Sequence, residues 1–291
     1  SCCGTQLCGT SSYGYEDAVI HRQGLGFMGF SKVRSVDSRG NLTVRTFDPY
    51  NHGVLKSVES PSSETYNTYS IEVKPNKVKK ILLDKKTENN LLTGYSTDYS
   101  YTYDPYGYPL TETAAYSDGI TVKTELSYGD SPETDGVYSL GFVTDRTVTT
   151  TRDGDTYTER THFPEYASRQ PLTAVRYVNG NKVERIDYTY DSHGNVTEET
   201  VTPYDSPNSL TSEYSYTETG RLAMETDPWG LTKAYAYDSS GRVTGITDYT
   251  GATVITYDSF GRETSREYPD GTKSIVSHEW VNDGAPGIYE V

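Results

Sequence analysis

Short stretches of strand-forming residues alternate with turns of one recurring pattern in the last third of the chain. Directly after a tyrosine, each turn has Asp or Thr followed three residues later by Gly, at 190–194, 216–220, 237–241 and 257–261. These tyrosines are 26, 21 and 20 residues apart, and an earlier relative occupies 101–107. A fixed period of this kind is typical of a repeat architecture, in which each repeat packs mainly on its neighbours.

A second series of turns lies between these copies, at 227–230 and 248–251, with a variant at 268–271. An Asp that opens a type I turn can accept a hydrogen bond from the backbone two residues on, and Gly takes the left-handed conformation of the bulge that follows. One turn every 10 or 11 residues leaves room for strands of six or seven residues. The strands that this spacing predicts are 231–237, 242–247, 252–257 and 262–267.

The polar pattern within these strands predicts a wall that is wet on both sides. Leu231, Lys233 and Tyr235 fall on one face of a strand. Thr232 and Ala234 fall on the other, so neither face is purely apolar. Roughly twenty meander strands would exceed what an open twisted sheet usually carries, so we predict an all-β antiparallel meander that curls into a solenoid-like sheet.

Turn signals elsewhere are less uniform. Asp153-Gly154 and Asn179-Gly180 predict two-residue hairpins, because both residues of such a turn need positive φ. Clusters of Ser, Pro, Gly and Asn predict longer irregular connections at 60–68, 129–136 and 203–209.

No linker divides the chain into independent domains. We expect an N-terminal β region over 1–100 and a region of Tyr-Asp repeats over 101–291, with the clearest repeats at 186–272. The two would form one continuous architecture.

Composition explains how such a wall can exist without a large core. Only 33% of the residues are hydrophobic, against a globular norm of about 45%, and the aromatic residues are 28 Tyr, 6 Phe and 2 Trp. The formal charge of −15 disfavours a nucleic-acid partner and an anionic membrane. No apolar run approaches the roughly 18 residues of a spanning helix, so we expect no membrane insertion, and these residues contain no signal peptide.

Candidate chemistry is sparse, and we predict no cofactor, no metal and no enzymatic activity. Three cysteines within eight residues cannot hold the body together, and they lack a fourth zinc ligand at suitable spacing. Glu198 and Glu199 are sequence neighbours that a strand would point to opposite faces, which disfavours paired-carboxylate hydrolysis. The cysteines are Cys2, Cys3 and Cys8, and the histidines, none in a metal spacing, are His21, His52, His162, His193 and His278.

The repeat has a known counterpart. The copies of Tyr-x-Tyr-Asp-x-x-Gly-Arg/Asn at 188–195, 235–242 and, with Ile255 replacing the first Tyr, 255–262 resemble the YD repeats of bacterial Rhs proteins. Such repeats also occur in the B and C components of insecticidal Tc toxins and in animal teneurins. The stretch around Gly-Phe-Met-Gly-Phe at 26–30 is similar to the segment that precedes the repeats in Tc-B-like and Rhs-like chains.

This resemblance implies a β ribbon wound into a hollow shell that encloses a toxic C-terminal domain or, in teneurins, forms part of an adhesion ectodomain. Rhs shells end in an Asp-Pro-x-Gly-Leu core motif that is associated with self-cleavage. The chain has this sequence at 227–231, but further repeats follow it, so we interpret it as an ordinary repeat turn.

We therefore expect a non-catalytic scaffold, part of an Rhs-type shell that encapsulates or presents a toxin polypeptide, secreted by a bacterium or displayed on its surface. Its partners would be a polypeptide cargo or neighbouring shell segments. The alternative is an extracellular adhesion module that binds a glycan or a protein through a tyrosine-rich face, where Trp229 and Trp280 could also stack on sugar rings.

The residues expected to matter are structural and make up the repeat signature. They are Tyr103, Asp104, Gly107, Tyr190, Asp191, Gly194, Tyr216, Gly220, Arg221, Tyr237, Asp238, Gly241, Arg242, Tyr257, Asp258, Gly261 and Arg262.

Overall fold

The structure is a computed structural model that describes residues 11–21, 26–132, 138–167, 169–276, 280–281 and 289–290. The cysteines Cys2, Cys3 and Cys8 and the histidine His278 lie outside the described residues, as do positions 22–25 of the N-terminal segment and 133–136 of the connection predicted at 129–136. The first part of that prediction is wrong, because 129–132 continue a strand. Of Trp280 only the backbone is described.

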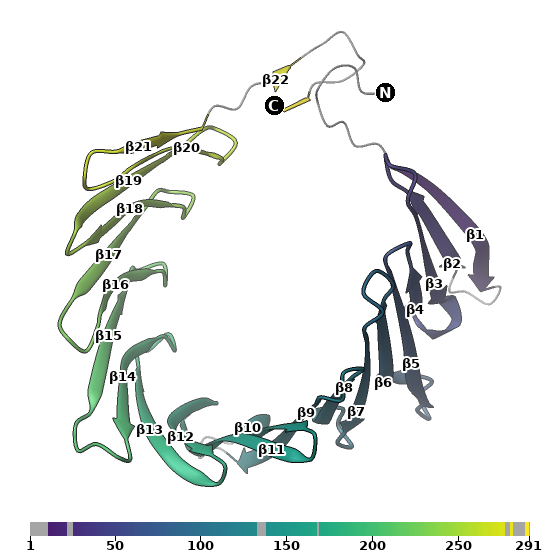
Figure 1. The fold of residues 1–291 in the computed structure, drawn as a ribbon, viewed down its shortest axis with the longest axis horizontal. Coiled ribbons are helices and arrows are strands. Elements are labelled where there is room, and N and C mark those ends of the chain that lie inside the picture. The colour runs from purple at the N-terminus through teal and green to yellow at the C-terminus, as the bar shows by residue number, and fades with distance from the viewer. Residues whose placement is uncertain are drawn as a thin grey trace. The chain divides into compact units, whose positions relative to one another are not determined.

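The chain divides into two compact units, one of residues Ser1–His162 and Arg176–Asn181 and the other of Phe163–Val175 and Lys182–Val291. Figure 1 shows the order of their strands by colour. The last strand of the first unit, β11, continues into the second unit. The strands of the first unit are β1 Ser12–His21, β2 Gly26–Val36, β3 Leu42–Asp48, β4 Val54–Glu59, β5 Ser63–Val73, β6 Lys79–Asn90, β7 Ser96–Tyr103, β8 Pro109–Tyr116, β9 Thr121–Pro132, β10 Tyr138–Arg152 and β11 Asp155–Ala167.

The second unit begins within β11 and shares the next two strands with the first. Its strands are β12 Gln170–Val178, β13 Asn181–Tyr190, β14 Val196–Pro203, β15 Leu210–Tyr216, β16 Leu222–Thr226, β17 Thr232–Tyr237, β18 Val243–Asp248, β19 Gly251–Tyr257, β20 Glu263–Glu267, β21 Lys273–Ile275, β22 Trp280–Val281 and β23 Tyr289–Glu290.

The predicted all-β antiparallel meander is confirmed. Strands β1 to β21 belong to one sheet, and strands that follow each other along the chain pair antiparallel, as β15 to β20 do in succession. The one helix of the described residues is a single 3-10 turn at Pro49–Asn51. Strands β22 and β23 form a separate pair.

The turns of the second unit alternate between two edges of the sheet (Figure 1). We name the edge with the turns at 191–194, 217–220, 238–241 and 258–261 the YD edge. The aromatic edge carries the connections at 204–209, 227–230, 248–251 and 268–271.

The sheet has almost no apolar core, as the alternation of polar residues predicts. Among the described residues only Ala114, Ala174, Val175 and Ile255 are buried hydrophobic side chains. Most strand residues are half-buried, including those of β14 from end to end. Backbone pairing and cross-strand contacts between side chains therefore hold most of the structure together.

Local predictions fared unevenly. Both two-residue hairpins are confirmed, because Asp153, Gly154, Asn179 and Gly180 all have positive φ. The irregular connection at 60–68 is wrong, since β5 starts at Ser63 and its β-branched and aromatic residues pair with β6. The connection after β14 is confirmed at 204–209.

No helix in the described residues is long and apolar enough to cross a membrane.

Candidate functional site

The Asp of each YD turn fixes the turn through one carboxylate oxygen. Oδ1 of Asp238 accepts hydrogen bonds from the backbone N–H groups of Ser240 and Arg242, at 2.9 and 3.0 Å. The amide of Gly241 donates to the carbonyl of Asp238, and Gly241 has a φ of +82°, the left-handed conformation that Gly adopts at least cost. Where Thr217 replaces the Asp, its hydroxyl accepts from the Arg221 amide instead.

The second oxygen of the same Asp binds the repeat's own arginine. Nε of Arg242 donates to Oδ2 of Asp238 at 2.7 Å, and Arg262 binds Asp258 in the same way. The backbone amide of Arg242 lowers the pKa of the Asp238 carboxyl group by donating a hydrogen bond to it, and the guanidinium of Arg242 lowers this pKa further. Arg262 acts on Asp258 in the same way. Each of these carboxylates is ionised, and its charge is balanced by the arginine of the same turn.

Each repeat also touches the one before it. The guanidinium of Arg242 lies over the ring of Tyr257, 4.8 Å from its centroid. The guanidinium of Arg221 lies over Tyr237 and so close to Gly241 that a Cβ atom there would overlap it. Gly241 is therefore required by close approach as well as by φ.

The tyrosine of the repeat closes a gap in the backbone ladder. Between β16 and β17 the paired residues end at Met224 and Ala234, and the two strands then part toward the YD edge. The hydroxyl of Tyr237, at the end of β17, crosses this gap and donates to the carbonyl of Leu222 at 2.7 Å. A phenol thus supplies the hydrogen bond that the backbone no longer makes.

This tyrosine latch recurs in both units with distances of 2.7 to 2.9 Å between the hydroxyl and carbonyl oxygens. In four of the latches the accepting carbonyl stands six positions after the tyrosine of the preceding latch, so these latches join one repeat to the next. The latches are Tyr69 to Leu55, Tyr103 to Leu83, Tyr128 to Pro109, Tyr190 to Pro171, Tyr216 to Val196, Tyr237 to Leu222 and Tyr257 to Val243.

A bulge accompanies the latch on the other side of each tyrosine. Ala236 pairs with Gly245 but Tyr237 pairs with Val243, so Thr244 has no partner opposite it. The same shift stands directly before the tyrosines of the other YD turns. A bulge increases local twist, which suits a strand that must part from one neighbour while it follows the other.

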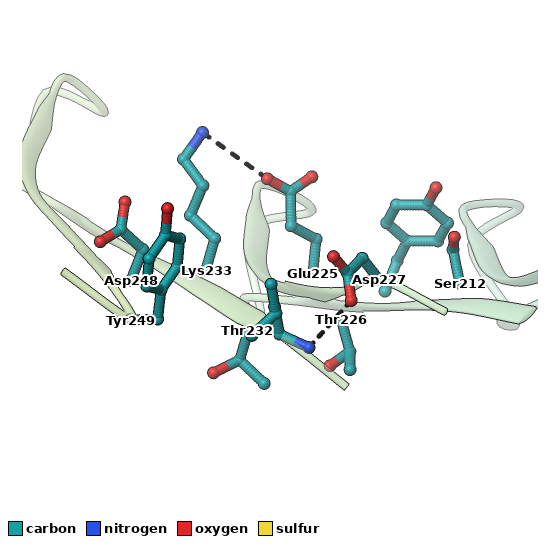
Figure 2. A pocket seen from close by; sticks show the side chains of 10 residues that line it. Ser212, Glu225, Thr226, Asp227, Thr232, Lys233, Asp248 and Tyr249 are labelled. Atoms are coloured by element: carbon teal, nitrogen blue, oxygen red, sulfur yellow. Dashed lines mark hydrogen bonds and ion pairs between the residues drawn. The ribbon is translucent and has the colours of Figure 1, made fainter. Parts of the chain in front are cut away.

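The aromatic edge carries a groove instead of a latch (Figure 2). A cavity of about 290 Å³ opens between the turns at 227–230 and 248–251. Figure 2 shows the ammonium of Lys233 directed toward Glu225, 3.7 Å away, with Asp248 and Tyr249 beside it. Three carboxylates and one lysine line this groove, which leaves it acidic.

The other candidate residues are not brought together into a reactive site. His162 contacts Asp145 at 3.1 Å, and His193 lies in the turn that Asp191 holds. Glu198 lies opposite Glu213 on β15, whereas its neighbour Glu199 lies opposite Ser212. The described residues contain no group of three or more His, Cys, Asp or Glu side chains that could hold a metal ion.

A family model described as RHS Repeat matches residues 237–273. The chain carries YD repeats of the Rhs type. The matched residues run from the Tyr237 latch through the next YD turn to just beyond the turn at 268–271. No curated protein matches the sequence.

Solved structures share the fold of this YD-repeat chain at low sequence identity. A crystal structure of TcdB2-TccC3 with Cdc42 covers 89% of the chain with a TM-score of 0.57 and 10% identity, and TcdB2-TccC3 gives the same three values. TcdB2-TccC3 without its hypervariable C-terminal region covers 85%, with a TM-score of 0.50 and 14% identity. The chain spans 21%, 22% and 14% of the length of those chains, respectively.

Sequence reasoning located the YD signature but missed two features. The carbonyl that each tyrosine binds has no side-chain signal, although in four of the seven latches it stands six residues after the preceding latch tyrosine, which could have been read from the repeat. The groove on the aromatic edge was missed because its turns were treated only as spacers. The coarser prediction, a scaffold built of Rhs-type repeats, is confirmed.

Proposed function

We propose that this chain is a non-catalytic wall segment that encloses or presents a polypeptide, delivered to the outside of a bacterial cell. The tyrosine latch is the observation that carries this proposal. Seven such bonds tie successive repeats together without an apolar core, so the sheet can extend in length while remaining wet on both faces. A barrier needs this property, whereas a reactive site does not.

Protease protection in the complete natural product that contains these repeats tests the proposal. We expect a companion polypeptide to resist added protease while the wall is intact. Replacement of Tyr216, Tyr237 and Tyr257 by Phe should accelerate its digestion, because three neighbouring latches are lost. A companion polypeptide that is cleaved as fast in the wild-type product as in isolation would contradict enclosure.

A matched control uses three tyrosines whose rings are more than half exposed. Tyr50, Tyr106 and Tyr249 are 65%, 71% and 78% exposed. Their replacement by Phe also removes three hydroxyl groups but breaks no latch, so the rate of digestion should be unchanged.

An adhesion module remains the second candidate, because exposed Trp229 and Tyr249 offer flat surfaces to a ligand. It would depend on these residues rather than on the latch tyrosines, whose hydroxyl groups already bind backbone carbonyls. Binding on a glycan array that is lost in Trp229→Ala and Tyr249→Ala would support it.

A further inference from the structure

The aspartates on the two edges of the second unit differ in the groups that bind their carboxylates. On the YD edge, Oδ2 of Asp238 and of Asp258 binds an arginine of the same turn. On the aromatic edge, Oδ1 of Asp227 accepts from the backbone N–H groups of Trp229 and Leu231, and position +4 holds this leucine in place of arginine. Within the described residues no basic side chain forms an ion pair with Asp227.

In the next two turns an aspartate is again held by a backbone amide, as the first residue of the turn at 248–251 and as the third residue of the turn at 268–271. Oδ1 of Asp248 accepts from the amide of Thr250, and Oδ1 of Asp270 accepts from the amide of Thr272. The threonine hydroxyl in each turn also lowers the pKa of its Asp, so both carboxylates stay charged. Like Asp227, neither has an ion-pair partner in the described part of the chain.

Each of these turns also exposes one aromatic ring. Trp229 is 76% exposed, Tyr249 is 78% exposed and Tyr268 is 41% exposed. Successive turns of this edge are two strands apart, which corresponds to a spacing of about 9.6 Å between turns, and the rings stand at the third, second and first positions of their turns. The aromatic edge is therefore a row of exposed rings, each beside a charged carboxylate.

A groove lies at each of the two successive pairs among the turns at 227–230, 248–251 and 268–271. The groove of about 290 Å³ is bounded by Asp227 of one turn and by Asp248 and Tyr249 of the next (Figure 2). Its lysine, Lys233, is already directed to Glu225. A second groove, of about 550 Å³, is lined by residues of the following pair of turns, namely Thr250, Tyr268, Pro269, Asp270 and Thr272.

The YD edge shows what fits between such groups. There Arg242 binds the carboxylate of Asp238 and lies over the ring of Tyr257, which belongs to the next repeat. The first groove of the aromatic edge is likewise lined by an aspartate of one turn, Asp227, and by a ring of the next turn, Tyr249, without an arginine. Guanidinium is the cation best suited to bind a carboxylate and stack on an aromatic face together.

We propose that the aromatic edge of the second unit binds an extended polypeptide segment that carries arginines, one guanidinium in each groove. An arginine at every third residue of a polyproline II segment recurs on one side at about 9.3 Å, close to the two-strand spacing of the turns. The acidic charge of the groove, like the net charge of −15, complements such a segment. This inference holds whether or not the wall encloses a polypeptide.

Fluorescence anisotropy with a labelled (Arg-Pro-Pro)₄ peptide tests the proposal on the full chain. Asp227→Asn and Asp248→Asn keep the oxygen that accepts from the turn amides and remove only the charge. We expect each of them, and Tyr249→Ala, to weaken binding by about tenfold, which corresponds to about 1.4 kcal/mol. The control Phe260→Ala, which removes a 70% exposed ring from the YD edge, should leave binding unchanged.

Two further peptides separate this recognition from simple charge attraction. A (Lys-Pro-Pro)₄ peptide should bind several-fold more weakly, because an ammonium cannot bind bidentately or stack as a guanidinium does. A peptide with the same arginines moved into one block should also bind more weakly. Equal affinity for all three peptides, or variants without effect, would overturn the proposal, as would a glycan ligand that requires Tyr249 while the arginine peptide does not bind.

Discussion

The hydroxyl of Tyr237 donates a 2.7 Å hydrogen bond to the backbone carbonyl of Leu222, at the point where the ladder between β16 and β17 ends. Tyr237→Phe keeps the ring and leaves that carbonyl without this donor. We expect the free energy of unfolding to fall by about 0.5 to 1.5 kcal/mol, the usual net value of such a bond. Urea denaturation measures the change.

The same substitution at Tyr249 provides the control for this prediction. Its ring is 78% exposed in a turn of the aromatic edge, so Tyr249→Phe should change stability by less than about 0.5 kcal/mol. Hydrogen exchange should also show faster opening of β16 and β17 in Tyr237→Phe, because the repeats depend on their immediate neighbours. Equal effects at the two tyrosines would contradict a latch.

Gly241 and Gly230 form a second matched pair, one on each edge. Their φ values are +82° and +83°, so replacement by Ala imposes the same left-handed strain of about 1 to 2 kcal/mol. A Cβ at Gly241 would also overlap the guanidinium of Arg221, whereas nothing lies within 4 Å at Gly230. Thermal and urea denaturation should show Gly241→Ala to be the more destabilising by about 0.5 to 1 kcal/mol, the value of a displaced cation–π contact.

An Arg221→Ala background distinguishes overlap from strain. There the two glycine substitutions should cost the same, because the guanidinium that Cβ would displace is gone. A difference that persists in this background would show that another contact is responsible.

The sequence was sufficient for these turns because their chemistry is local. Asp238 and Gly241 fix the turn within five residues, and the period of about 20 residues repeats it, so strand bounds were predicted to within a residue or two. The Tyr237 latch depends on where two strands part, and the groove beside Tyr249 depends on which turns share an edge. Neither property belongs to a single segment, which is why the sequence alone did not show them.

The aspartates of the YD turns predict the response to acid. The folded state lowers the pKa of Asp191, Asp238 and Asp258 below the ordinary value of 3.8. Their contribution is complete above that value, where both states are ionised, and is lost as the pH falls below it because the unfolded chain then takes up protons first. Urea midpoints between about pH 5 and pH 2 should decline, and less steeply in Asp238→Asn. An identical decline in this variant would exclude Asp238 as a source.

The tyrosines predict the response to alkali. Burial raises the pKa of Tyr103, Tyr190 and Tyr216, and raises that of Tyr101 to about 12. The unfolded chain loses these protons near pH 10, before the folded one does, so stability should be constant below about pH 10 and fall above it. Phenolate absorbance should show an early group of exposed tyrosines and a late group that ionises together with the loss of β-sheet circular dichroism. Ionisation of all tyrosines in one early step, with the sheet intact, would contradict this assignment.

Glu198 and Glu213 face each other across β14 and β15, so the sheet holds two carboxylates directly opposite one another. Like charges in this position are destabilising, and opposite charges contribute about 0.2 to 1 kcal/mol. Glu213→Lys should therefore raise the urea midpoint, and the gain should shrink in high salt because both side chains are partly exposed to solvent. Glu218→Lys changes the net charge equally from an exposed turn position without a residue opposite, and it serves as the control. An equal gain from both substitutions would show relief of the overall charge of −15 rather than repair of this cross-strand pair.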